Sequence, residues 1–325
     1  MSIKQFNGLG VAIVTPFDSD GNIDYYSWDI MLKTINDVVD YIVLFGTTGE
    51  SPVIELDEKQ EAIKYFTKHL SGKTKLVVGI GGNNTKKVIQ EINKLDLNGV
   101  SAILSVCPYY NKPSQEGIFA HYKAISEASP LPIIAYNVPG RTVINIEAKT
   151  SLRLANELEN VVALKEATAD LDQLMNILNE RPDNFTVLCG DDALALSFMS
   201  VGADGVISVI ANAFPRAFAK MTAFALEGNI DIARQYHYAL LPLMHTLLKY
   251  EKGAPMQIDA NIAVNFKNKF EIGTGYRSSN SISFLGGIYA LDHLKLVYYY
   301  NIGLKNALLG NSHGILISYS FNKKD

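Results

Sequence analysis

At 325 residues, the chain is long enough for one large domain or two ordinary ones. Hydrophobic residues make up 48% of it and charged residues 19%, a balance that excludes an intrinsically disordered protein. The net charge of −4 gives no reason to expect nucleic acid or an anionic lipid surface as a partner.

Several features favour a cytoplasmic protein that needs no metal or other cofactor. The first eight residues lack the cationic and apolar regions of a secretory signal peptide. No segment reaches the ~20 apolar residues of a membrane-spanning helix. Two cysteines, Cys107 and Cys189, suit a reducing compartment. The six histidines are scattered without a pair at metal-ligand spacing, so we predict no metal site.

Apolar runs alternate with helix-length segments over residues 1–227. Alternating strands and helices predict a parallel sheet with right-handed crossovers. Eight such units fit an α/β fold of the (β/α)₈ or TIM-barrel type better than an open doubly wound sheet. We therefore expect a catalytic barrel in residues 1–227, followed by a helix in residues 228–249. The eight predicted strands are Gly8–Phe17, Tyr41–Thr47, Lys75–Gly81, Ser101–Pro108, Pro132–Asn137, Val161–Thr168, Phe185–Cys189 and Gly205–Ile210.

The hydrophobic pattern changes near residue 250. From Gln257 onward, apolar and polar residues alternate strictly, in runs rich in Tyr and Phe. A period of two predicts antiparallel strands, so we expect a β-rich C-terminal segment over residues 250–325. The alternation is similar to that of transmembrane β-strands, a weak signal for any single segment, and a small β-appendage on the barrel is the alternative. The later runs are Phe270–Arg277, Ile282–Ala290, Leu294–Ile302 and Ile315–Phe321.

Lys165 interrupts the apolar run Val161–Thr168. Lysine is almost never fully buried unless something holds it there, and an amine removed from water turns more readily into a nucleophile toward carbonyl carbon. A lysine that reaches solvent from the strand end is the ordinary explanation for this segment alone. Lys165 shares side-chain parity with Val161 and Ala163, so Glu166 would point outward to the helices.

Other strand ends add polar groups, because a barrel of this type has its active site at the C-terminal ends of its strands. The turn Gly46–Ser51 carries two hydroxyls and suits a small carboxylate, although most such turns are only turns. Tyr109, Tyr110 and Tyr136 could relay protons or simply pack at the rim. Arg141 could bind a carboxylate or lie on the surface.

Two further segments have ordinary explanations. Asp191 and Asp192 follow the seventh strand, and N-capping of a helix explains an aspartate there more often than a metal does. The glycine cluster that ends the third strand is weak evidence for a nucleotide, and we expect Thr85 after it to cap a helix.

Five motifs in chain order give residues 5–246 a specific resemblance to the dihydrodipicolinate synthases, which belong to the pyruvate-dependent class I aldolases together with N-acetylneuraminate lyase. The arginine in the third of them favours the synthases over the lyase. The motifs are Gly46–Ser51, Pro108–Gly117, Tyr136–Thr142, Val161–Thr168 and Gly190–Ala193.

The resemblance implies an enzyme that condenses pyruvate with L-aspartate 4-semialdehyde in the lysine and diaminopimelate pathway. Lys165 would form the Schiff base. Tyr136, Tyr110 and either Thr48 or its neighbour Thr47 would relay protons, and Thr47 matches the family's threonine by register. Tyr110 would reach into a neighbouring subunit's site, which implies a homodimer or homotetramer. Thr48 would hold the pyruvate carboxylate and Arg141 that of the semialdehyde. Gly190 and Ile207 would line the pocket through backbone carbonyls.

The same resemblance implies an effector site at a dimer interface, where Ser51, Asn83 and Tyr109 match the family. Leu56, Lys59 and Lys87 stand where lysine-inhibited relatives carry histidine and glutamate. The resemblance therefore does not predict feedback by lysine.

The C-terminal quarter departs from this family, which would continue with a turn and two more helices. Residues 248–321 instead resemble the last strands of the outer-membrane protein family of type IX secretion, in the stretches 249–255, 270–277 and 312–321. The chain is therefore interpreted as a chimera joined near residues 246–250. We expect no functional membrane insertion, because an unclosed set of strands has open edges.

Three functional hypotheses follow. The first is a synthase whose chemistry lies within residues 1–246. The second is an inactive chimeric product with an intact barrel core, or another pyruvate-dependent aldolase. The third, ranked last, is a secretion-associated membrane protein. The β-rich segment would be less ordered than the barrel, with rapid proteolysis near residues 250–257.

Overall fold

The computed structural model describes residues 4–250, 259–266, 269–277, 281–291, 294–303 and 312–319. These residues divide into two compact units, Met1–His245 and Thr246–Asp325. The division falls inside helix α10 (Ile230–Tyr250), close to the predicted join. The segment predicted to be protease-sensitive, 250–257, lies outside the described residues except for Tyr250.

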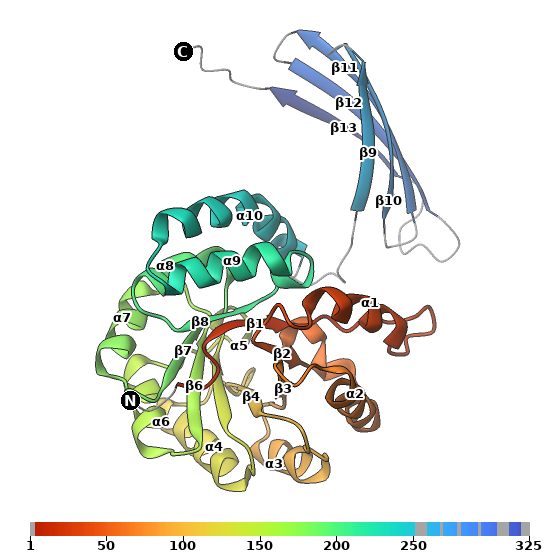
Figure 1. The fold of residues 1–325 in the computed structure, drawn as a ribbon. Helices are drawn as coiled ribbons and strands as arrows, with labels where there is room; N and C mark the ends of the chain where they lie inside the picture. The colour runs from red at the N-terminus through yellow and green to blue at the C-terminus, as the bar shows by residue number, and fades with distance from the viewer. Residues whose placement is uncertain are drawn as a thin grey trace. The chain divides into compact units, whose positions relative to one another are not determined.

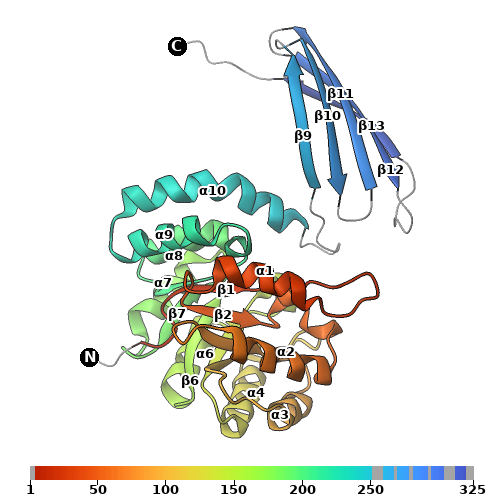
Figure 2. The same cartoon turned by 45° about the vertical axis from the view of Figure 1, so that its right-hand side comes forward.

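The first unit is a closed parallel barrel, as the strand pattern predicted. Each strand pairs with the next along the chain, and β1 closes the ring against β8. Helices surround the strands in both views (Figure 1, Figure 2). The strands are β1 (Gly8–Ala12), β2 (Tyr41–Leu44), β3 (Lys75–Gly79), β4 (Ala102–Val106), β5 (Ile133–Asn137), β6 (Val161–Glu166), β7 (Thr186–Cys189) and β8 (Gly205–Ser208).

The helices follow the strands in the expected alternation. Their bounds are α1 (Tyr25–Ile35), α2 (Leu56–His69), α3 (Thr85–Lys94), α4 (Gln115–Ala128), α5 (Pro139–Thr142), α6 (Ala148–Glu157), α7 (Leu171–Glu180), α8 (Ala195–Ser200) and α9 (Pro215–Leu226), with short 3₁₀ turns at Thr47–Gly49, Ser51–Val53, Asp192–Leu194 and Ile210–Asn212. No helix in the described part of the chain is both long and apolar enough to cross a membrane.

Two local predictions need correction. Thr85 is the first residue of α3 and not its cap, because the Asn84 side chain accepts a hydrogen bond from the backbone N–H of Lys87. The first strand ends at Ala12 and not at Phe17. Pro16 lies in the interval and has no N–H for a strand ladder, so the chain keeps only an isolated bridge between Phe17 and Ile23.

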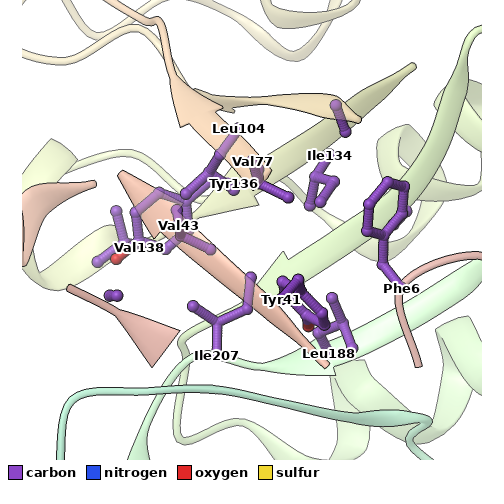
Figure 3. Packing of buried hydrophobic residues seen from close by; sticks show 13 residues of the cluster. Phe6, Tyr41, Val43, Val77, Leu104, Ile134, Tyr136, Val138, Leu188 and Ile207 are labelled. Atoms are coloured by element: carbon purple, nitrogen blue, oxygen red, sulfur yellow. The ribbon is translucent and has the colours of Figure 1, made fainter. Parts of the chain in front are cut away.

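The barrel interior is a packed core and not a channel. Side chains from every strand, together with Phe6 and Val138, form one buried cluster inside the ring, and Figure 3 labels most of its members. Tyr41 is completely buried there, and its ring packs edge-on against Phe6 at 5.8 Å between centroids. Tyr136 and Ile207, two predicted site residues, belong to this cluster as well. The site is therefore held by rigid core packing.

The second unit contains one antiparallel sheet of five strands in the order β13-β12-β11-β10-β9. Its strands are β9 (Asp259–Phe266), β10 (Phe270–Arg277), β11 (Ser281–Leu291), β12 (Leu294–Gly303) and β13 (Ser312–Tyr319). Each pairs only with its neighbours in sequence, so the sheet is an open meander. The alternating sequence pattern predicted this antiparallel arrangement correctly.

Candidate active site

Lys165 lies inside the barrel near the end of β6, with 4% of its surface exposed. Its Nζ atom is 4.3 Å from the centroid of the Tyr136 ring on β5, and the two residues are Cα partners in the strand register. A cation over an aromatic face is attracted by the ring quadrupole. The amine and the phenol are thereby held face to face in a site with little access to water.

Tyr136 is fixed from outside the barrel by Tyr122 of α4. The Tyr122 hydroxyl donates to the carbonyl oxygen of Ser105 at 2.8 Å and accepts from the backbone N–H of Tyr136 at 3.3 Å. The hydroxyl both donates and accepts although the side chain is fully buried. Tyr122 therefore joins β4 to β5 at the level of the candidate site, a role that its position on a helix gave no reason to predict.

A cavity of about 430 Å³ opens beside Tyr136. Three of the predicted catalytic and substrate-binding residues line it: Thr47, Tyr136 and Arg141. Arg141 belongs to the short helix α5, which the sequence did not predict and which directly follows β5. Because Arg141 lines the cavity, its guanidinium group could bind an anionic group of a ligand there.

The turn that carries Thr47 and Thr48 is held by close backbone contacts. The Thr15 hydroxyl donates to the carbonyl oxygen of Gly49 at 2.7 Å. A Cβ atom on Gly79 would collide with the carbonyl oxygen of Phe45, so only glycine allows this approach of β3 to the turn. Thr48 is half-buried and lies outside the cavity lining.

Gly190 lies next to Lys165, whereas Ile207 lies in the interior cluster. A Cβ atom on Gly190 would sit 3.0 Å from Cε of Lys165 and 2.7 Å from Cβ of Ala167, so this glycine leaves room for the lysine side chain. The Gly190 N–H donates to the Glu166 carbonyl oxygen at 2.7 Å. Ile207 is fully buried in the interior cluster with Tyr136.

Tyr110 is not brought to the cavity of its own barrel. The side chain is 84% exposed, and the backbone adopts a left-handed φ of 71°. Its neighbour Tyr109 does line the cavity. The left-handed conformation, uncommon for a bulky residue, turns the chain at this point so that the two tyrosines have different environments.

The predicted effector residues are divided in the same way. Ser51 and Tyr109 line the cavity, whereas Asn83 is half-buried and outside its lining. Lys59 and Glu91 line the same cavity and form an ion pair, with 2.8 Å between Nζ and Oε1. The charge of Lys59 is therefore neutralised within this chain.

Two carboxylates near the site, Glu166 and Asp192, are buried, which their sequence positions did not predict. Glu166 is fully buried and accepts hydrogen bonds from the side chains of Asn137 and Gln173. Asp192 accepts from the backbone N–H groups of Val209 and Ile210, at 3.0 and 2.7 Å. Burial raises the pKa of the Asp192 carboxyl to about 6.

The neighbouring Asp191 has the structural role that the sequence predicted for this pair. Its side chain accepts a hydrogen bond from the Ala193 N–H at 2.8 Å and caps the 3₁₀ turn Asp192–Leu194. Within the described residues, no cluster of histidine, cysteine or carboxylate side chains could hold a metal ion.

A closed parallel (β/α)₈ barrel with a buried lysine facing a tyrosine at adjacent strand ends defines a lyase of the Schiff-base-forming, class I aldolase type. Residues 5–265 match the Dihydrodipicolinate synthetase family. The chain belongs to that family.

Similar proteins agree with this assignment. A 4-hydroxy-tetrahydrodipicolinate synthase from Azobacteroides pseudotrichonymphae is 43% identical over 266 residues, which cover 82% of this chain and 90% of the relative. The enzyme of that name from Cytophaga hutchinsonii is 46% identical over 257 residues, covering 79% and 86%. The crystal structure of dihydrodipicolinate synthase from Aquifex aeolicus superposes with a TM-score of 0.72 at 38% identity, covering 75% of this chain and 83% of that one.

Residues 216–319 match a second family, the Type IX secretion system membrane protein PorP/SprF. The two matches overlap between residues 216 and 265. The chain therefore joins a dihydrodipicolinate synthase barrel to strands similar to those of a membrane protein, as the two resemblances in the sequence predicted.

Proposed function

We propose that this chain is a 4-hydroxy-tetrahydrodipicolinate synthase, which condenses pyruvate with L-aspartate 4-semialdehyde in the lysine and diaminopimelate pathway. The observation that carries the proposal is the 4.3 Å approach of Lys165 Nζ to the Tyr136 ring inside the barrel, beside a cavity lined by Thr47 and Arg141. The relatives of that name, which are 43% and 46% identical to the chain, support the choice of reaction.

The chemistry begins with Lys165. Its amine adds to the carbonyl carbon of pyruvate, water leaves, and an iminium forms. The iminium accepts the electron pair released when the methyl group loses a proton, and the resulting enamine carbon attacks the aldehyde carbon of the semialdehyde. The aldehyde oxygen takes up a proton. The amino group of the semialdehyde then displaces Lys165, which returns to its free form.

The proton transfers fall to hydroxyl groups near the lysine. Tyr136 is the best-placed of them, because it contacts Lys165 and lines the cavity. Thr47 lines the same cavity and is the second member of the relay. Thr48 binds the pyruvate carboxylate, and Gly190 and Ile207 complete the pyruvate pocket near Lys165. Arg141 binds the carboxylate of the semialdehyde through a charge-assisted contact.

Tyr110 completes the relay from a second copy of the chain. Its exposed side chain supports this role, since it lies outside the lining of its own cavity in the described part of the chain. The proposal therefore includes a homodimer or homotetramer. One similar structure is described as the first monomeric dihydrodipicolinate synthase variant, so the assembly state of this chain has to be measured. Both cysteines are buried and free, which suits a cytoplasmic enzyme.

Trapping of the Schiff base tests the proposal. The full chain is incubated with pyruvate, reduced with borohydride and digested, and we expect one pyruvate-derived mass on the peptide that contains Lys165. Condensation is measured in parallel with pyruvate and L-aspartate 4-semialdehyde. Absence of any condensation in the full chain would mean that the proposed reaction is wrong.

Lys59 supplies a matched control. It is a buried lysine that lines the cavity, 8% exposed, and it is paired with Glu91. Lys59→Met should keep the trapped mass, whereas Lys165→Ala should lose it. Trapping that persists in Lys165→Ala would assign the nucleophile to another residue.

A further inference from the structure

Glu166 follows Lys165 in β6 and points to the opposite side of the sheet. It is fully buried, and none of the ion pairs found in the described residues includes it. Such a carboxylate needs hydrogen bonds to replace water. Burial raises the pKa of the Glu166 carboxyl, while hydrogen bonds from Asn137, Thr168 and Gln173 lower it.

N–H groups surround this carboxylate on both of its oxygens. Oε1 accepts from Asn137 Nδ2 at 3.0 Å and from the Thr168 N–H at 2.9 Å. Oε2 accepts from Asn137 Nδ2 at 3.0 Å and from Gln173 Nε2 at 3.1 Å. Both oxygens therefore act as acceptors. An amide in place of the carboxylate would direct its own N–H groups at one or more of these donors, whichever way it was turned.

The donors connect the carboxylate to the segment after β5. Asn137 uses its Oδ1 to accept from the Ile146 N–H at 3.0 Å and its Nδ2 to reach Asn145 Oδ1 at 2.7 Å. Gln173 of α7 accepts from Asn145 Nδ2 at 2.7 Å. The orientation of the Asn137 and Gln173 amides is set by Glu166, because each must present nitrogen to it. Residues 145 and 146 are thereby fixed to the ends of β5 and β6.

The segment fixed in this way carries Arg141. Helix α5 (Pro139–Thr142) lies between Asn137, at the end of β5, and Asn145, so both ends of this stretch are tied to the same network. The Thr142 hydroxyl donates to the Ile144 carbonyl oxygen at 2.8 Å and stiffens the turn between them. The position of the Arg141 side chain in the cavity thus depends on where this stretch is held.

We propose that Glu166 is a positioning residue for the second substrate: its carboxylate orients Asn137 and Gln173, which hold the 138–147 segment and place Arg141 in the cavity. This inference rests on the proposed function, since it concerns the subsite for the semialdehyde. Glu166 itself faces away from the cavity and touches no substrate. Its removal should damage use of the semialdehyde and leave Schiff-base formation with pyruvate intact.

Glu166→Gln tests the proposal with almost no change in shape. In one orientation the introduced amide directs its N–H groups at Asn137 and Gln173, which must turn and lose their contacts to residues 145 and 146. In the other it directs them at Asn137 and at the Thr168 N–H, which cannot turn, so the end of β6 loses its contact to this side chain. We expect kcat/KM for the semialdehyde to fall about tenfold or more, while borohydride trapping of pyruvate stays within about twofold of the wild-type value. Equal loss of both steps would overturn the proposal, and so would an unchanged semialdehyde kcat/KM.

A second substitution moves the carboxylate to the neighbouring strand. When Glu166→Gln is combined with Asn137→Asp, the introduced amide on β6 can donate to the introduced carboxylate on β5. That carboxylate still accepts from the Ile146 N–H, and the Gln173 and Asn145 amides can turn together, but the Ile146 carbonyl oxygen loses its long contacts to Asn137 Nδ2 and Gln173 Nε2, at 3.4 and 3.3 Å. We therefore expect a partial recovery, with semialdehyde kcat/KM at least about threefold above that of Glu166→Gln. Failure of the double variant to exceed Glu166→Gln would contradict the charge-placement argument.

Two measurements separate this inference from loss of stability and from failure of the proposed function. Ile35→Ala removes a fully buried side chain of α1, away from the network, and should lower stability without changing the ratio of semialdehyde use to pyruvate trapping. Hydrogen exchange of the peptide spanning 138–147 should quicken in Glu166→Gln and not in Ile35→Ala. That readout needs no substrate, so it decides the positioning role even if the full chain catalyses no condensation.

Discussion

The two units solve the problem of a strand's exposed polar edge in different ways. The barrel closes on itself, so every one of its eight strands has a partner on both sides. The C-terminal sheet stays open, and β9 and β13 each have one unpaired edge among the described residues. Both units are built from strands rich in apolar residues, so composition alone does not separate them.

The two units also differ in what covers their apolar side chains. In the barrel, helices cover the outer face of the strands and the interior cluster fills the centre (Figure 3). In the sheet, one face leaves a row of large apolar side chains between 36% and 63% exposed: Phe270, Ile272, Phe284, Ile288, Tyr298, Tyr300 and Ile302. Exposed apolar patches of this kind favour association with other apolar surfaces. The strands of the sheet pair with their neighbours, but the apolar side chains on this face stay exposed. In the barrel, every strand is paired on both sides and the apolar side chains are buried as well.

The largest effect on catalysis is expected when a lysine of the barrel is replaced and compared with a lysine of the sheet. Lys165→Ala should lower condensation by about 10³-fold or more, because it removes the group that forms the covalent bond. Lys295→Ala in β12 should leave kcat/KM within about twofold, since all candidate chemistry lies in the barrel. Steady-state kinetics of the full chain with both substrates measure this. A large loss from the β12 substitution would show that the sheet contributes to catalysis.

Arginines give the next comparison. Arg141→Ala should cost about 100-fold in kcat/KM for the semialdehyde, the scale for losing a charge-assisted contact of a few kcal/mol, and should spare Schiff-base trapping. Arg277→Ala in β10 should have no effect on either step. Kinetics with the semialdehyde varied at saturating pyruvate provide the measurement. If trapping falls in parallel with turnover in Arg141→Ala, the arginine supports the fold and not the substrate.

Alanine substitutions at one glycine of each unit compare how closely the two units are packed. Gly79→Ala places a methyl group against the Phe45 carbonyl and should destabilise the barrel by up to about 3 kcal/mol. Gly286→Ala in β11 meets nothing within 4 Å and should change stability by less than about 0.5 kcal/mol. Trp28, the only tryptophan of the chain, is fully buried in α1 and reports barrel unfolding by fluorescence. Circular dichroism follows the Gly286 variant. Similar costs at both positions would mean that the sheet face is covered in solution.

The smallest effect concerns pH. His121 of α4 is 4% exposed, its Nδ1 lies 2.8 Å from the Thr85 hydroxyl, and burial lowers the pKa of its imidazole to about 4. As the pH falls, His121 is protonated in the unfolded chain at a higher pH than in the folded barrel. The stability that the neutral, buried His121 contributes is therefore complete above about pH 6.5 and falls as the pH drops toward 4. Between pH 6.5 and 5 the loss is about 2 kcal/mol, at about 1.4 kcal/mol per unit.

His121→Gln should remove this part of the pH dependence, and His313→Gln in β13 should not. Denaturant unfolding followed by Trp28 fluorescence at pH 7.5 and about 5 checks both variants, because contributions from carboxylates cancel in the differences. An equal pH slope in wild type and His121→Gln would show that another group titrates.

Much of the barrel could be predicted because each of its strands is marked by the hydrophobic pattern of a short stretch of sequence. Eight apolar runs at even spacing define the strands, and Lys165 is conspicuous as a charge within one of them. The positioning role proposed for Glu166 could not be predicted, because its partners Asn137 and Gln173 come from two other segments and only the fold brings them together. The helix α5 is four residues long, too short for a hydrophobic period, so the immediate setting of Arg141 was missed as well.

The sheet was predicted from period alone, which fixes strand direction and alternation but not closure. Nothing in a two-residue repeat says whether the last strand will meet the first. That depends on how many strands the chain supplies and on their stagger, which are properties of the whole set. The open edges of β9 and β13 were expected from the resemblance to a partial set of barrel strands and not from the two-residue period.

Tyr110 has a consequence for how the enzyme behaves on dilution. In the proposed mechanism, Tyr110, which is 84% exposed and has a left-handed backbone, completes the proton relay only where two chains meet. Turnover per molecule then becomes a function of protein concentration, constant while the assembly persists and falling once it dissociates. Dilution would slow each chain without unfolding it, and adding back a catalytically dead Lys165→Ala chain, which still carries Tyr110, would restore the lost rate.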